Sequence, residues 1–172
     1  DILVTQLEIP MDTVEYALKK AKEAGKTTIL NPAPAAPLND EIIRNSDIII
    51  PNESELGIIT GMPTNTLEEI EAAAHKLLNM GVKELIVTLG SQGSLHLNKK
   101  GSVMHTAYKV KAVDTTAAGD SFIGGLVRNI QADNLDEAIE FATKVSAITV
   151  TRKGAQISIP TIEEVENFKG EK

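Results

Sequence analysis

The sequence predicts an α/β protein in which a mostly parallel sheet is covered by helices on both faces, a three-layer α/β/α sandwich. Apolar runs of strand length alternate with segments whose apolar residues recur at helical spacing. Strands joined by helices run parallel and are usually covered on both faces. In addition, the loops NPAPA, PNESE, TLGSQG and DTTAAGD each follow a predicted strand. Such loops meet at the carboxyl edge of a parallel sheet, where ligands bind.

The first predicted elements are a strand, a helix and a second strand. The run ILVTQL is a short buried strand. Pro10 begins a helix from about Met11 to Ala24, and Gly25 stops it. KTTILN is the second strand, and the loop NPAPAAP follows it. A short helix at 40–44 then leads to a third strand, DIIIPN.

Two helices, a fourth strand and a hairpin region come next. ESELGIITG is predicted to be a helix, and residues 66–81 form another with one apolar face made by Ile70, Ala73, Ala74, Leu77 and Leu78. KELIVTLG is the fourth strand. The segment GSLHLNKKGSVMHTAYKVKAV predicts one or two hairpins that turn at NKKGS. The alternation of Tyr108, Val110 and Ala112 extends the strand character to the end of this segment.

The last part of the chain is predicted to be helical. Helices are expected at 118–131, from Leu135 to about Thr151, and from Thr161 onward. The chain has no internal repeat, low-complexity tract or linker. We therefore expect one domain or most of one.

Composition narrows the class of protein. The chain has 172 residues, 42% of them hydrophobic, and a net charge of −7, which suits a folded domain and argues against nucleic acid or a membrane surface as a partner. No cysteine is present, so a cytoplasmic location is expected and a thiolate metal site is excluded. The chain opens at Asp1 in an apparent strand. We expect that an N-terminal part of the native protein is missing from it.

The stretch AVDTTAAGDSF indicates an anion site. Its small residues lie at the start of the helix at 118–131, where free N–H groups and the helix dipole favour an anion. A phosphate can approach the backbone closely only where side chains are small, as at Gly119. Asp120 would then be a general base beside a phosphoryl group. The alternative is that Asp120 only caps or stabilises the first helical turn.

These motifs resemble the ribokinase/fructokinase family of carbohydrate kinases. DTTAAGD is similar to the family's C-terminal signature, and ILNPAPA, PNESE, VTLGSQG and VTRKGAQ resemble, in order, other loops of its ribokinase members. The resemblance implies a Rossmann-like, ribokinase-like fold without its N-terminal part and lid. Residues 1–172 would be the C-terminal part of the kinase domain, with the ATP site and the catalytic base.

The resemblance also implies roles for residues at the start of the helix at 118–131. Asp120 would be the base, and the backbone amides of Ala117, Ala118 and Gly119 would form the anion hole. Many family members carry Gly at the position of Ala117. Glu8, in the context TQLE, would contact a sugar hydroxyl.

Nucleotide contacts are implied for the other loops. Asn52 and Glu55 would organise Mg²⁺ and the phosphates, although an N-x-x-E pair could otherwise be an N-cap with a helix-start carboxylate. Asn31 would reach the ATP phosphates. Further contacts to the nucleotide would come from Thr88, Gly90, Gly93 and Thr143.

A monovalent-cation site for K⁺ is implied at the end of the second C-terminal helix. Its ligands would come from Asp114, Thr116, Thr149, Arg152, Gly154 and Ser158. The alternative for Arg152 to Gly154 is a helix C-terminus that satisfies its last carbonyls. The histidines His75, His96 and His105 have no ligand spacing and are expected to be structural or solvent-facing.

The implied activity is that of an ATP-dependent sugar kinase, with D-ribose converted to D-ribose 5-phosphate. The alternatives are another family sugar kinase, such as a fructokinase, or a nucleotide-binding fragment without turnover. The resemblance further implies ATP, Mg²⁺ and K⁺ as cofactors and a homodimer for the full-length protein.

Overall fold

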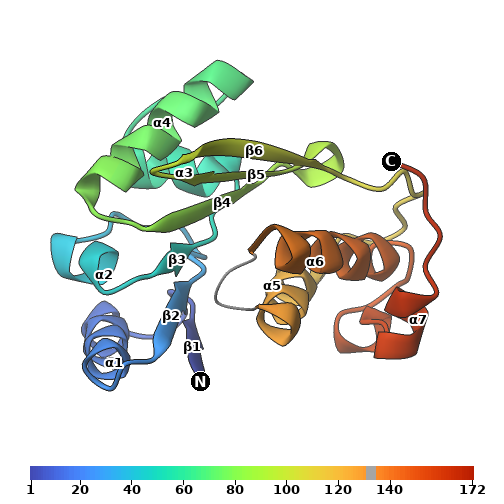
Figure 1. Ribbon diagram of the computed structural model, residues 1–172, viewed down its shortest axis with the longest axis horizontal. Helices are drawn as coiled ribbons and strands as arrows, with labels where there is room; N and C mark the ends of the chain where they lie inside the picture. Colours follow the sequence, from blue (N-terminus) through green and yellow to red (C-terminus); the bar gives the residue numbers. More distant parts are fainter. Residues whose placement is uncertain (131–134) are drawn as a thin grey trace. The chain divides into compact units, whose positions relative to one another are not determined.

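The computed structural model describes residues 1–130 and 135–172 (Figure 1). Its elements are β1 (Ile2–Thr5), α1 (Met11–Glu23), β2 (Thr27–Leu30), α2 (Asp40–Arg44), β3 (Ile48–Ile49), α3 (Glu53–Thr60), α4 (Leu67–Met80), β4 (Glu84–Thr88), η1 (Gly90–Gln92), β5 (Gly93–Asn98), β6 (Gly101–Thr106), α5 (Ala118–Asn129), α6 (Leu135–Thr149), η2 (Gln156–Ser158) and α7 (Ile162–Glu166). The predicted end of α5 at Gln131 lies outside the described residues. Among the described residues, no helix has both the length and the apolar character needed to cross a membrane.

The chain folds as two compact units. The first consists of Asp1–Leu89 and Leu95–Met104, and the second of Gly90–Ser94 and His105–Lys172. The strands of the first unit are mostly parallel, whereas the main elements of the second are helices.

The strands form one six-stranded sheet in the order β1-β2-β3-β4-β5-β6. The pairs β1–β2, β2–β3 and β3–β4 are parallel. Only Lys99 and Lys100 connect β5 to β6, and so short a connection joins antiparallel strands. The prediction of a mostly parallel sheet with a hairpin turning at NKKGS is therefore confirmed.

Helices α1, α2 and α4 bury one face each in the core of the first unit. Val14 and Leu18 of α1 are fully buried, as are Ile42 and Ile43 of α2. The predicted apolar face of α4 is also buried (Ile70, Ala73, Ala74, Leu77 and Leu78). Burial of each valine, leucine or isoleucine among them contributes about 1.5–3 kcal/mol. The strands β2 to β4 contribute apolar side chains to this core, among them Leu30, Ile49, Leu85 and Val87.

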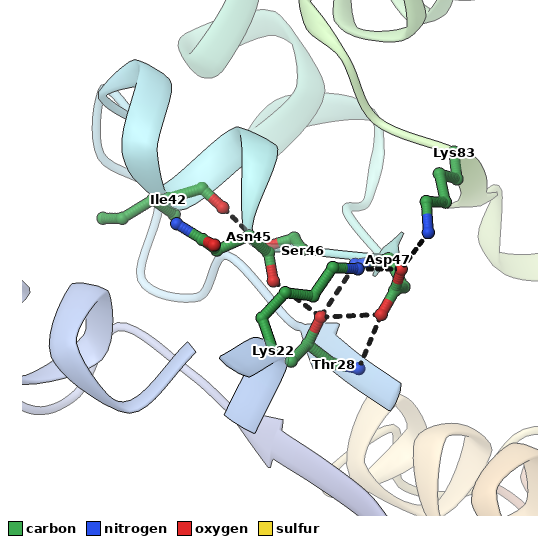
Figure 2. A network of polar contacts seen from close by, with 7 residues as sticks. All are labelled: Lys22, Thr28, Ile42, Asn45, Ser46, Asp47 and Lys83. Carbon is green, nitrogen blue, oxygen red and sulfur yellow. Dashed lines mark hydrogen bonds and ion pairs between the residues drawn. The ribbon is translucent and has the colours of Figure 1, made fainter. Parts of the chain in front are cut away.

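A polar network ties the amino ends of β2, β3 and β4 together (Figure 2). The backbone N–H and the hydroxyl of Thr28 both donate to Asp47 Oδ2 at 3.1 Å. Lys83 Nζ donates to Asp47 Oδ1 at 2.8 Å, and Lys22 of α1 contacts the same oxygen. Burial of Asp47 raises its pKa, but these donors outweigh it and hold the pKa at about 2. The network fixes the strand starts at the edge opposite the predicted ligand edge.

In the second unit, α5 and α6 pack closely against each other. A Cβ placed on Gly125 of α5 would lie 2.9 Å from Val145 Cγ2 and 3.0 Å from Ala142 Cα. The two helices can approach this closely because residue 125 has no side chain. Val145 and Ile148 of α6 also form a small buried cluster with Val165 of α7.

The strand predicted through Tyr108, Val110 and Ala112 is wrong, since residues 107–112 form no strand. Tyr108 is held instead by a hydrogen bond to Glu140 and by an edge-on ring contact with Phe168, 5.1 Å between centroids. The Lys109 N–H donates to Glu171 O at 2.7 Å. The alternating pattern thus reflects packing on α6 and on the C-terminal segment, not pairing with a strand.

Candidate active site

Three predicted site residues of the first unit lie side by side at the carboxyl edge of the sheet. Asn31 follows β2, and its Nδ2 donates to Ile50 O at 2.9 Å. Asn52 follows β3 and forms an isolated parallel bridge with Thr88, the last residue of β4. Three neighbouring strands therefore present an amide, a second amide and a hydroxyl at one edge, as their loops predicted.

Asn52 and Glu55 form a capping box at the start of α3. The Glu55 N–H donates to Asn52 Oδ1 at 2.8 Å, and the Asn52 N–H donates to Glu55 Oε2 at 2.8 Å. Burial of Glu55 raises its pKa, and the hydrogen bond from the Asn52 N–H opposes this shift without cancelling it. Within residues 1–130 and 135–172, Asn52 Nδ2 and Glu55 Oε1 make no hydrogen bond. The box holds the pair rigidly and leaves one carboxylate oxygen for a ligand such as Mg²⁺, which prefers oxygen donors and bound water.

Glu8 lies in the loop after β1 and is exposed. The neighbouring Leu7 N–H donates to Ala33 O at 2.9 Å, which ties this loop to the NPAPA loop after β2. The Glu8 carboxylate is thus carried on a loop of the same sheet edge as Asn31.

Gly90 and Gly93, the two glycines that follow β4, have different structural roles. A Cβ on Gly93 would lie 1.9 Å from His105 O and 2.7 Å from Ala107 N, and its φ is +112°. Gly93 is therefore required by the close approach of the backbone. Gly90 has a φ of +54°, and nothing lies within 4 Å of the position that a Cβ on it would occupy. Its left-handed turn therefore leaves open space in front of it.

The second unit carries the start of α5. Ala117, the N-cap, has φ 60° and ψ 13°, and it is the one non-glycine residue with positive φ among the described residues. The Ala118 N–H donates to Thr115 O at 3.1 Å, so this member of the predicted anion hole already has an acceptor. In the described part of the chain, the amides of Ala117, Gly119 and Asp120 have none. Three free N–H groups thus remain at the helix start.

Asp120 is exposed in the first turn of α5. Its carboxylate makes no hydrogen bond or ion pair with any residue that the structure describes. Asp120 therefore does not cap the helix through its side chain, in contrast to Asn39, Thr66 and Thr161 at other helix starts. Its carboxylate is left available to accept a proton.

Asp114 joins the loop before α5 to the loop after α6. Its Oδ1 accepts from the Thr116 hydroxyl at 2.6 Å and N–H at 3.0 Å, and its Oδ2 accepts from the Gly154 N–H at 3.0 Å. These bonds, led by the Thr116 hydroxyl, lower the pKa of Asp114 to about 2. Val150 O accepts from the N–H groups of both Val113 and Asp114. An ionised carboxylate among backbone carbonyls suits a hard monovalent cation.

The other residues predicted for the cation site differ in what they offer. Thr149 O accepts from the Arg152 N–H at 3.1 Å, and the Thr149 hydroxyl donates to Val145 O at 2.9 Å. The buried Ser158 hydroxyl donates to Ala155 O at 2.6 Å, which leaves its lone pairs for a ligand. The Arg152 side chain pairs with Glu164 of α7, so Arg152 could serve the ion only through its backbone carbonyl.

Thr143 of α6 is 6% exposed, and its hydroxyl donates to Ile139 O at 2.8 Å. This bond within the helix uses the only proton of the hydroxyl. Because the hydroxyl can still accept a hydrogen bond, the contact of Thr143 with the nucleotide stays a prediction.

The three histidines differ in their surroundings. His75 is exposed on α4, and His96 is buried with its Nε2 2.7 Å from Glu84 Oε2. His105 Nε2 lies 3.0 Å from Asp136 Oδ1 of α6.

Sequence reasoning missed two serines beside the start of α5. The hydroxyls of Ser121 and Ser146 both donate to Ala118 O. Since Ser146 lies on another helix, no local pattern in the sequence connects it to the start of α5.

Comparison with known proteins gives a consistent result. Residues 3–162 match the model described as pfkB family carbohydrate kinase. The chain is 45% identical over 167 residues to the ribokinase of Staphylococcus aureus (strain COL), covering 96% of this chain and 55% of that protein. It is 47% identical over 171 residues to the ribokinase of Schizosaccharomyces pombe, covering 96% of this chain and 54% of that protein.

A solved structure of Arabidopsis thaliana ribokinase, complexed with ribose and ATP, is also similar. Its TM-score to this chain is 0.91 at 34% identity, covering 98% of this chain and 56% of that one. This similarity confirms the predicted α/β fold class. The chain spans about half the length of the curated relatives that it matches.

Proposed function

Because the chain belongs to the pfkB family of carbohydrate kinases, we propose that it supplies the ATP-binding and catalytic part of a kinase that phosphorylates D-ribose. The observation that carries this proposal is the unpaired carboxylate of Asp120 beside the free amides of the α5 start. The relatives at 45% and 47% identity bear the name ribokinase, which supports ribose as the acceptor.

In the proposed reaction, Asp120 accepts the proton of the primary hydroxyl of ribose while the hydroxyl oxygen attacks the γ-phosphorus of ATP in line. The bond from the γ-phosphorus to the bridging oxygen of ADP breaks. The products are ADP and D-ribose 5-phosphate. The free amides of Ala117 and Gly119 donate to the phosphoryl oxygens as negative charge develops there, and a preorganised donor of this kind contributes about 3 kcal/mol.

The remaining loops would bind and orient the substrates. Asn31 and Thr88 would contact the nucleotide, and the open space at Gly90 would admit its phosphates. Glu8 would accept a hydrogen bond from a sugar hydroxyl. Asn52 and Glu55 would hold Mg²⁺ through water, and this ion supplies charge neutralisation on the phosphates when it is bound.

For K⁺, we propose a site at the junction of Asp114 with the loop at 150–154. Asp114, the Ser158 hydroxyl and nearby carbonyls fit such an ion, which would support the turn before α5 from behind. We also propose a homodimer for the full-length protein and a cytoplasmic location. These two proposals rest on the family and on the absence of cysteine.

An ADP-release assay with D-ribose, D-fructose and adenosine tests the proposal. We expect ribose to give the highest kcat/KM. Fructose as the preferred acceptor would favour a fructokinase. ATP binding without ADP release for any acceptor would mean that this chain binds the nucleotide but does not turn over.

The variant Asp120→Asn tests the base. We expect its kcat to fall by several orders of magnitude while ATP affinity changes only a few-fold, because the carboxylate is proposed to contact the alcohol and not the nucleotide. Unchanged turnover would be incompatible with this role.

A further inference from the structure

The carbonyl oxygen of Ala118, at the start of α5, accepts hydrogen bonds from two side-chain hydroxyls. Ser121 Oγ, on the same helix, donates at 3.0 Å. Ser146 Oγ, on α6, donates at 3.2 Å. Ser121 is 3% exposed and Ser146 is half-buried. Two hydroxyls therefore converge on one carbonyl at the start of α5.

The bond from Ser146 differs from those of the other hydroxyls on the same helix. A Ser or Thr within a helix usually donates to the carbonyl four residues before it. Thr143 and Thr149 of α6 follow this rule, with bonds to Ile139 O and Val145 O. Ser146 instead donates across to α5, so its hydroxyl acts on the neighbouring helix.

The acceptor carbonyl belongs to the same peptide group as the Gly119 amide. The C=O of Ala118 and the N–H of Gly119 share one planar unit and point in opposite directions. Hydrogen bonds to the oxygen polarise the unit and strengthen its N–H as a donor, by about 10–30% for each bond. They also fix the direction in which this N–H points.

The Gly119 amide is free to use this polarisation. No acceptor for it exists among the residues described by the structure. The space beside Gly119 is open, since nothing lies within 4 Å of the position where a Cβ would be. Gly119 is also exposed, so this turn is accessible to a ligand.

We propose that Ser146, together with Ser121, is a positioning residue that orients and polarises the Gly119 amide toward the phosphoryl group being transferred. The statement that a phosphoryl group accepts the hydrogen bond of this amide rests on the proposed function. The polarisation of the amide does not, because it follows from hydrogen bonds within the second unit alone.

The test is the variant Ser146→Ala, which removes the hydroxyl without adding bulk to α6. In ¹H–¹⁵N spectra of the chain, we expect the amide proton of Gly119 to move upfield, by more than those of Ala117 and Asp120. In the kinase assay, we expect kcat to fall about two- to five-fold with an unchanged KM for ATP, from the 10–30% weakening of one preorganised donor. Ser121→Ala should move the same resonance in the same direction.

Thr60→Val is the matched control. It removes a buried hydroxyl that donates to Leu56 O at 2.7 Å within α3, and it should leave both the Gly119 resonance and kcat unchanged. A Gly119 shift in Ser146→Ala no larger than in this control would overturn the inference. A clear Gly119 shift with an unchanged kcat would overturn the catalytic part of it.

These outcomes also separate the inference from the proposed function. If the unmodified chain shows no turnover with any sugar, the proposed function has failed for this chain. The Gly119 resonance in Ser146→Ala still decides whether the serine polarises that amide.

Discussion

The residue that shapes the start of α5 is Ala117. Its φ of 60° lies in the left-handed region, where a Cβ approaches the following carbonyl. This conformation turns the chain from the Asp114–Thr116 bonds into the helix and leaves the amides of Gly119 and Asp120 without acceptors. The chain therefore accepts backbone strain at the point where the proposed anion hole is formed.

Replacing Ala117 by Gly should relieve this strain. We expect Ala117→Gly to raise the free energy of unfolding by about 1 kcal/mol, because glycine adopts positive φ without a Cβ clash. Urea denaturation measures the change.

The matched control is Ala17→Gly, the same substitution inside α1. There glycine should lower the free energy of unfolding by about 1 kcal/mol, since the helical φ suits alanine. If both variants were destabilised equally, the strain at Ala117 would be refuted.

Among the elements, α5 and α6 depend on a glycine at their contact. Gly125→Ala would place a Cβ 3.0 Å from Ala142 Cα, which is backbone and cannot rotate away. We expect this variant to lower the free energy of unfolding by about 1–3 kcal/mol through overpacking. Thermal or urea unfolding checks it.

The adjacent Gly124→Ala provides the control, because a Cβ there has nothing within 4 Å. With the clash absent, the higher helix propensity of alanine should raise the stability by about 0.5–1 kcal/mol. A stabilised Gly125→Ala variant would contradict the close approach of the two helices.

The strands β2, β3 and β4 are joined at their amino ends by Asp47, and this junction should be acid-labile. The folded-state pKa of about 2 lies below the ordinary value of 3.8. The ionised carboxylate therefore stabilises the folded state fully above pH 4, and this contribution is lost as the pH falls through 4 towards 2. A shift of this size corresponds to about 2 kcal/mol.

Asp47→Asn tests the junction. We expect it to be less stable than the unmodified chain at pH 7, with a difference that shrinks as the pH falls towards 2, because the folded-state carboxyl group becomes protonated there too. Urea unfolding at several pH values measures this difference. A difference that did not depend on pH would show that the charge of Asp47 makes no contribution.

At the scale of the whole molecule, the sequence predicted the alternation of strands and helices well. The spacing of apolar residues and the positions of turn residues are local signals. The bounds of α2 and the turn of the hairpin followed from them. The strand predicted at Tyr108 failed because its pattern arises from contacts with Glu140 and Phe168, which are distant in sequence. Local alternation does not reveal which partner covers a side chain.

In the candidate site, too, some features could be recognised from the local sequence and others only from the structure. Asn52, Glu55 and Asp120 lie next to turns and helix starts, so local motifs pointed to them, and the family resemblance supplied their predicted roles. The bonds of Ser146 to Ala118 O and of the Gly154 N–H to Asp114 join separate segments and left no local signal. Similarly, the hydrogen bond from the Thr143 hydroxyl to Ile139 O was found only in the structure.

Binding of K⁺ at the Asp114 junction should stabilise the whole chain, because an ion that binds only the folded state shifts the unfolding equilibrium. We expect a higher Tm in KCl than in NaCl of equal ionic strength, and a higher kcat if the chain turns over. Asp114→Asn should abolish the difference between the two salts, since it removes the only charged group proposed to contact the ion. The control is Asp136→Asn, a carboxylate of α6 outside this junction, which should keep the preference for KCl. Equal melting temperatures in the two salts for the unmodified chain would refute the cation site while leaving the proposed roles of Asp120 and the free amides untouched.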